Sequence, residues 1–140
     1  MLIKKFQDQK EIIAGDDCIL RELLNPSSSA LADYAGQVPR GDKVECRYSI
    51  AWAKVPVGKT TFKHAMKTTE VYVITSGRGK MFIKDEVEEV GKYDTIYIPP
   101  NAIQCIENIG GEELEFICIV DPAWRPEDEV IGAGLDLPVH

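Results

Sequence analysis

Short runs of apolar and β-branched residues, each closed by a turn signal, dominate the chain between residues 44 and 120. Glycine, proline and asparagine separate runs of this kind because they adopt turn conformations and interrupt strands. The expected strands cover residues 44–55, 60–66, 70–75, 80–84, 87–90, 95–98, 103–109 and 114–120. No connection between them is long enough for a helical crossover, so the strands should pair antiparallel. The pattern therefore predicts an all-β sandwich or barrel.

The segments that flank this region lack its regular spacing. Residues 1–43 combine one expected strand, 18–24, with a connecting excursion rich in Ser, Ala, Gly and Pro, and both should pack on the barrel. Residues 121–140 contain three prolines and five acidic residues, which favours a surface tail. A chain of 140 residues has the size of a single domain, so residues 44–120 are expected to hold its core.

The composition is typical of a globular protein, with 44% hydrophobic and 28% charged residues. The formal net charge of −7 repels phosphate backbones and anionic lipid headgroups, so we expect neither nucleic acid nor a membrane surface as a partner. No stretch approaches the roughly 20 apolar residues that span a bilayer. The first residues also lack the apolar run of a signal peptide. We therefore expect a cytoplasmic protein.

Four cysteines occur without the C-x-x-C spacing of metal or redox sites, at Cys18, Cys46, Cys105 and Cys118. Disulfides are rare in reducing compartments, so buried thiols are the expected state. Cys105 follows Gln104 on an expected strand, and alternation turns it away from the face that Gln104 occupies. A catalytic thiol is therefore not expected at this position.

Polar side chains recur on single faces of three expected strands. His64 shares one face with Met66. Glu70 shares a face of the next strand with Tyr72, and Gln104 begins a third stripe. If the first two strands pair as a hairpin, His64 and Glu70 point into one cavity. An imidazole, a carboxylate and a carboxamide that converge inside a barrel suit a metal ion or a polar substrate.

These residues stand at the spacing of two motifs of the cupin family, which the chain resembles over roughly residues 44–120. The first motif reads G-x5-H-x-H-x3,4-E-x6-G, and its positions fall on Gly58, His64, Met66, Glu70 and Gly77. The second motif reads G-x5-P-x-G-x2-H-x3-N, and its positions fall on Tyr93, Pro99, Asn101, Gln104 and Asn108. The resemblance implies a double-stranded β-helix, a jelly-roll-like barrel in which three histidines and the glutamate hold a metal.

The chain departs from these motifs at two metal-ligand positions. Met66 replaces the second histidine of the first motif, and Gln104 replaces the histidine of the second. His64 and Glu70 are therefore the two usual ligands that remain. Gln104 offers a weaker carbonyl ligand, whereas the thioether of Met66 is a poor partner for hard divalent ions. The loss of two imidazoles should weaken metal affinity by orders of magnitude.

Three interpretations of His64 and Glu70 stay open. In the first, they bind a divalent ion such as Zn, Fe, Mn or Ni together with Gln104. In the second, they act without metal as a hydrogen-bonding or acid–base pair, with His64 as the catalytic base that Glu70 orients. In the third, they only satisfy each other inside a packed barrel. A histidine beside a carboxylate should hold its proton more tightly, which suits the last two interpretations.

Other residues are candidates for substrate binding. Tyr72 and Trp52 could line the pocket, because amphipathic aromatic rings suit sugars or aromatic ligands, and ordinary barrel packing is the alternative. Met66 is expected in the pocket wall, and Gln104 would hydrogen-bond the substrate. The resemblance implies isomerases, decarboxylases or dioxygenases, so we expect an enzyme that acts on a small polar metabolite, a sugar or an organic acid. A non-catalytic module that binds or senses a small ligand is the alternative, and the resemblance implies a homodimer.

Overall fold

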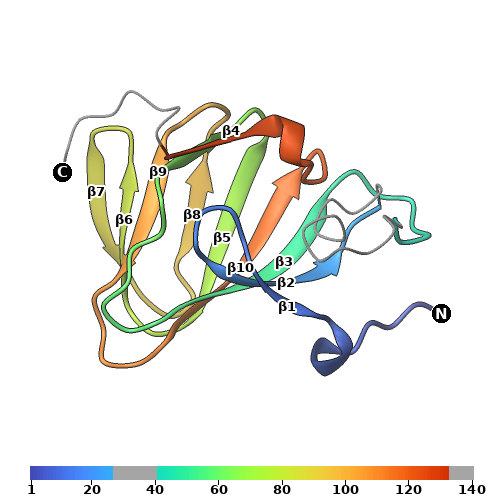
Figure 1. Cartoon of the computed structure of the whole chain (residues 1–140), viewed down its shortest axis with the longest axis horizontal. Helices are drawn as coiled ribbons and strands as arrows, with labels where there is room; N and C mark the ends of the chain where they lie inside the picture. Colours follow the sequence, from blue (N-terminus) through green and yellow to red (C-terminus); the bar gives the residue numbers. More distant parts are fainter. Residues whose placement is uncertain (27–40, 133–140) are drawn as a thin grey trace.

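The computed structural model describes residues 1–26 and 41–132. Within these ranges eleven strands form two sheets (Figure 1). The six-stranded sheet has the order β1 (Glu11–Ile13), β2 (Ile19–Leu24), β3 (Ser49–Val55), β10 (Leu114–Asp121), β5 (Thr69–Ser76) and β8 (Thr95–Ile98). The five-stranded sheet has the order β11 (Glu129–Ile131), β4 (His64–Met66), β9 (Gln104–Asn108), β6 (Gly79–Ile83) and β7 (Glu86–Val90). Every named strand pair is antiparallel, so the predicted antiparallel all-β architecture is confirmed.

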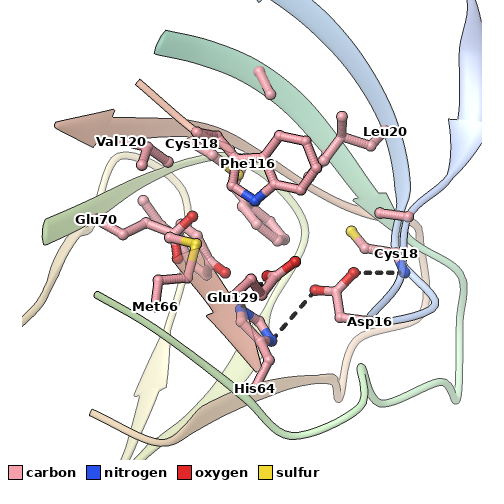
Figure 2. Close-up of a pocket in the computed structure, with 15 residues that line it drawn as sticks. Asp16, Cys18, Leu20, His64, Met66, Glu70, Phe116, Cys118, Val120 and Glu129 are labelled. Carbon is pink, nitrogen blue, oxygen red and sulfur yellow. Dashed lines mark hydrogen bonds and ion pairs between the residues drawn. The ribbon is translucent and has the colours of Figure 1, made fainter. Parts of the chain in front are cut away.

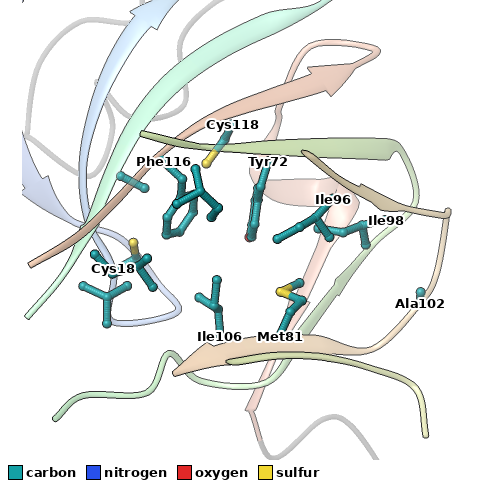
Figure 3. Packing of buried hydrophobic residues seen from close by; sticks show 13 residues of the cluster. Cys18, Tyr72, Met81, Ile96, Ile98, Ala102, Ile106, Phe116 and Cys118 are labelled. Atoms are coloured by element: carbon teal, nitrogen blue, oxygen red, sulfur yellow. The ribbon is translucent and has the colours of Figure 1, made fainter. Parts of the chain in front are cut away.

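The core lies between the two sheets. Strand β10 shows the reason most clearly, because its residues alternate between buried and half-buried along its whole length. That period of two places one face of the strand on the core. Figure 3 shows the inner faces of the two sheets meeting through apolar side chains. The cluster consists of Cys18, Ala53, Val55, Tyr72, Ile74, Met81, Ile96, Ile98, Ala102, Ile106, Leu114, Phe116 and Cys118.

Four turn positions of the two motifs adopt left-handed backbone, and Gly58 is the first of them, with a φ of 77°. Gly77 has a φ of 83°, and a Cβ there would lie 2.6 Å from the carbonyl oxygen of Glu113, so glycine is required. Asn101 has a φ of 64°, which asparagine tolerates better than other residues with a side chain. Tyr93 has a φ of 72°, where tyrosine is strained. The chain therefore keeps the backbone of the motif at two positions where it lacks the glycine.

The structure corrects several boundaries and pairings. The expected strand 44–55 begins only at Ser49, and strand 60–66 shortens to β4. The hairpin expected between the strands of His64 and Glu70 is wrong, because β4 pairs with β9 and β11 whereas β5 pairs with β8 and β10. The two short strands β1 and β11 were not expected. Much of the connecting excursion, at 27–40, and the end of the tail lie outside the described residues.

Two further expectations concern the cysteines and the membrane. All four cysteines are thiols, and Cys18, Cys105 and Cys118 are buried while Cys46 is half-buried. Burial raises the pKa of each of the three buried thiols, which keeps them protonated and unreactive.

Among the described residues, no helix has the length and apolar character needed to cross a membrane.

Candidate functional site

Two facing sheets bring the predicted polar residues together. His64 on β4 lies directly opposite Gln104 on β9, so both side chains leave the same face of the smaller sheet. Glu70, the second residue of β5, belongs to the larger sheet and is buried on the inner side. All three are at most 6% exposed. Their meeting therefore depends on the packing of one sheet on the other rather than on the expected hairpin.

Gln104 links two residues of the larger sheet through its carboxamide. Its Nε2 donates to Oε1 of Glu70 at 2.7 Å, and its Oε1 accepts from the hydroxyl of Tyr72 at 3.1 Å. Both ends of the amide are thus engaged, which fixes its orientation. The carbonyl oxygen that the sequence offered as a metal ligand accepts a hydrogen bond from Tyr72 instead.

His64 lies between two carboxyl groups that the sequence analysis did not identify. Its Nδ1 is 3.6 Å from Oδ2 of Asp16, and its Nε2 is 3.9 Å from Oε2 of Glu129 (Figure 2). Both distances exceed those of an ordinary hydrogen bond, so the contacts are electrostatic. Nδ1 also lies 3.3 Å from the carbonyl oxygen of Phe62. A carboxyl group faces each ring nitrogen, an arrangement that favours the imidazolium form.

The carboxyl groups and the burial act on His64 in opposite directions. Burial lowers its pKa because it disfavours the charged ring, whereas Asp16, Glu70 and Glu129 raise it. The carboxyl groups prevail, and the pKa of His64 lies above its ordinary value of 6.5. His64 therefore holds its proton more tightly than an ordinary histidine does.

Glu70 and Glu129 also hold their protons more tightly than usual. Burial raises the pKa of Glu70 to about 7, although His64 and the hydrogen bond from Gln104 act against it. Burial likewise raises the pKa of Glu129, against the effects of His64 and of a hydrogen bond with Trp124. Near pH 7, Glu70 therefore exists in both protonation states, which is the condition for accepting or donating a proton.

A cavity of about 60 Å³ opens beside this cluster. In Figure 2, Phe116, Cys118 and Val120 of β10 form the wall across from His64, and Leu20 of β2 continues it. The lining residues are Ala14, Asp16, Cys18, Leu20, Ala51, Ala53, His64, Met66, Glu70, Tyr72, Phe116, Cys118, Val120, Trp124 and Glu129. The space is thus mainly apolar, with the titratable groups gathered at one end.

The predicted substrate-binding residues differ in where they lie. Met66 and Tyr72 line the cavity, whereas Gln104 lies next to it and acts through Glu70. Trp52 does not reach the cavity, so its predicted role is wrong. Its neighbours on β3, Ala51 and Ala53, line the cavity, and alternation turns Trp52 to the other face.

The outward side of β3 gives Trp52 a structural environment. Its ring makes an edge contact with Phe6 at a centroid distance of 5.0 Å, and its indole nitrogen donates to Oε1 of Glu115 at 3.0 Å. The tryptophan that lines the cavity is instead Trp124, in the segment after β10. The predicted aromatic residue was therefore on the right strand but on the wrong face.

Asp16 and Glu129 reach the cavity from opposite ends of the chain. Asp16 lies in the loop between β1 and β2, where its Oδ1 accepts from the backbone of Cys18 at 3.1 Å. The backbone of Phe62 donates to the carbonyl oxygen of Asp16 at 2.7 Å, which ties this loop to the segment before β4. Glu129 begins β11 and pairs with Met66. Neither residue has a periodic pattern around it that could have identified it.

The described residues do not fit a metal ion at the motif positions. Met66 contributes a thioether, and the carbonyl oxygen of Gln104 is engaged by Tyr72. The two nitrogens of His64 face different carboxyl groups. Among the described residues, no group of three or more His, Cys, Asp and Glu side chains is arranged to hold a metal. Cupins often bind metals, but this donor set favours none of Zn, Fe, Mn or Ni.

Comparison with known proteins places the chain in a family. The model of the cupin domain matches residues 51–120. The uncharacterized protein MJ1618 of Methanocaldococcus jannaschii is 40% identical over 132 residues, which cover 93% of this chain and 94% of that protein.

Solved structures agree on the fold. A cupin 2 conserved barrel domain protein from Salinispora arenicola has a TM-score of 0.67 at 14% identity, covering 91% of each chain. The polyketide cyclase RemF from Streptomyces resistomycificus has a TM-score of 0.67 at 18% identity, covering 90% of this chain and 82% of its own. The predicted double-stranded β-helix is confirmed, and the chain belongs to the cupin superfamily.

Proposed function

We propose that this protein binds a small polar ligand in the cavity and moves protons on it, with His64 and Glu70 as the acid–base pair and no metal. The observation that carries the proposal is Glu70, whose buried carboxyl group lines the cavity with a pKa of about 7. A general acid or base works best when its pKa lies near the working pH. The sequence left this metal-free interpretation open beside two others.

The charge of each residue decides its role, with Glu70 as the base and His64 as the acid. Ionised Glu70 takes a proton from the ligand, while the imidazolium of His64 donates one to a second atom of the ligand. The ligand then keeps its proton count, Glu70 is protonated and His64 is neutral. Exchange with solvent restores both residues. An isomerisation or an elimination has these requirements.

The remaining contacts support these roles. Oε1 of Glu70 is held by Gln104, and no hydrogen bond to its Oε2 is formed by the described residues, so this oxygen is available to a ligand. Asp16 and Glu129 raise the pKa of His64, which favours its imidazolium form. The polyketide cyclase RemF, a structural relative, is an example of a cupin enzyme.

Deuterium exchange at carbon tests the proposal. Hydroxyacetone, glyceraldehyde and aminoacetone would be incubated with the protein in D2O, and loss of the proton beside the carbonyl would be followed by NMR. We expect exchange with at least one probe, slower by about 10²-fold or more in Glu70→Gln. Trp52→Phe, on the outer face of β3, should exchange like the wild type. Exchange no faster in the wild type than in Glu70→Gln for all three probes would refute catalysis.

The same samples separate the non-catalytic alternative. A module that only binds or senses a ligand would change the signals of cavity residues without exchanging any ligand proton. A raised pKa at both His64 and Glu70 is not required for binding alone, and for that reason the enzyme is the function we favour.

A further inference from the structure

The charges around the cavity are unbalanced. Three carboxyl groups line it, from Asp16, Glu70 and Glu129, and the basic group among the described lining residues is the imidazole of His64. No lysine or arginine is among the described residues that form its wall. Two of the three carboxyl groups come from segments outside the matched cupin domain, 51–120, so the imbalance is a feature that this chain adds to its barrel.

One carboxyl oxygen at the cavity has no hydrogen-bond donor among the described residues. Glu70 is 6% exposed and uses Oε1 for the hydrogen bond from Gln104, whereas its Oε2 receives no hydrogen bond from the described residues. Because Glu70 lines the cavity, this oxygen is open to a ligand there.

The cavity wall across from His64 suits a ligand that has an apolar body and a positively charged group. Phe116, Leu20 and Trp124 give the cavity an apolar and partly aromatic surface. An ammonium group interacts favourably with carboxylates and with aromatic faces. An anionic group would instead meet the carboxyl groups of Asp16 and Glu129, which only the imidazole of His64 offsets because the described wall holds no lysine or arginine, and the low dielectric of a buried site makes this costly.

We infer that the ligand carries a primary ammonium group, held by the carboxyl groups of Glu129 and Asp16, on a short apolar body that contacts Phe116, while Glu70 stays available as the base. The inference rests on the proposed function because it concerns the same cavity. It decides between ligand classes that the sequence left open, because it favours a cationic ligand over an organic acid. The mutual repulsion of the carboxyl groups, which contributes to the raised pKa of Glu70 and Glu129, is relieved when a cation enters.

Three probes of nearly equal size and different charge test the inference: n-propylamine, 1-propanol and propionate at pH 7. The chain has three methionines, so labelling their methyl groups with ¹³C gives few signals. Met66 lines the cavity, whereas Met1 is fully exposed and Met81 lies in the core outside the cavity wall. A shift of the Met66 signal without shifts at Met1 and Met81 therefore reports occupation of the cavity.

We expect n-propylamine to shift the Met66 signal with a Kd at least about tenfold lower than that of 1-propanol, and propionate to leave it unchanged. Glu129→Gln should reduce the preference for the amine. Glu127→Gln is the matched control, because it removes the same charge two residues away on a side chain that is 59% exposed, and it should keep the preference.

The outcomes separate the two proposals. Propionate binding as tightly as n-propylamine, or 1-propanol binding within tenfold of it, would overturn the inference and leave the proposed function intact. A Met66 signal that none of the three probes shifts would show that the cavity takes no small ligand, which would refute both.

Discussion

The free energy of unfolding of the wild type should fall as the pH rises, because Glu70 ionises. Replacing Glu70 with glutamine should abolish this fall. The folded chain gives Glu70 a pKa of about 7, compared with 4.5 for an ordinary glutamate. A shift of this size corresponds to roughly 3 kcal/mol between the two protonation states. Glu70 is buried, so solvent does not screen the effect.

The sign follows from proton binding. Between pH 4.5 and pH 7 the folded protein keeps a proton on Glu70 that the unfolded chain has released, so the free energy of unfolding falls as the pH rises. The contribution of Glu70 is complete below pH 4.5 and is lost above pH 7. Glutamine keeps a carbonyl oxygen for the hydrogen bond from Gln104 but cannot ionise.

Urea unfolding of the wild type and Glu70→Gln from pH 4.5 to 8.5 measures this contribution. The free energy of unfolding of the variant, relative to the wild type, should increase by about 3 kcal/mol across the series. Glu86→Gln, the same substitution at an exposed position of β7, is the control and should run parallel to the wild type. A difference between wild type and Glu70→Gln that stays constant with pH, or that shrinks as the pH rises, would refute the reasoning.

Three further substitutions test the turns and the site. Gly77→Ala should lower the free energy of unfolding in urea by more than about 2 kcal/mol, and by more than Gly58→Ala does. Both positions have positive φ, but only at Gly77 would a Cβ meet the backbone. Equal losses of stability would contradict this. Tyr93→Gly should stabilise the protein by about 0.5–1 kcal/mol, since the φ of 72° strains a tyrosine that is 73% exposed, and a lower melting temperature would refute it. Asp16→Asn should lower the pKa of His64 in an NMR titration, because Asp16 is its strongest carboxyl neighbour, and an unchanged pKa would show that the contact is inert.

The barrel was predictable because its signals are local. A period of two, as in β10, together with turn residues between the strands, identifies antiparallel strands without any knowledge of their partners. Strand pairing was less accessible: β4 and β5 are neighbours in sequence with a short connection, yet they enter different sheets. The sequence shows that the chain turns after Met66, but it does not show which strands β4 pairs with.

The candidate site was predictable to the same extent. His64, Glu70 and Gln104 stand on strands whose inward face the motifs indicate, and they do meet. Asp16 and Glu129 were not predicted because the segments around them have no regular hydrophobic pattern. Only the tertiary fold brings these segments to His64.

Trp52 was assigned to the wrong face for a related reason. Both faces of β3 carry apolar side chains, with Ala51 and Ala53 on the inner face and Trp52 on the outer one. Hydrophobicity therefore does not distinguish the two faces of this strand. The outer face is apolar because Phe6, from the N-terminal segment, covers Trp52.

The central claim is that carboxyl groups, rather than burial, decide the charge of the histidine in the cavity. A pH titration of the ¹⁵N signals of the His64 ring in the wild-type protein measures this directly. The account predicts a pKa above 6.5, with both ring nitrogens protonated at pH 6. A pKa below 6.5, with a neutral ring at that pH, would show that burial prevails and that His64 cannot act as the acid.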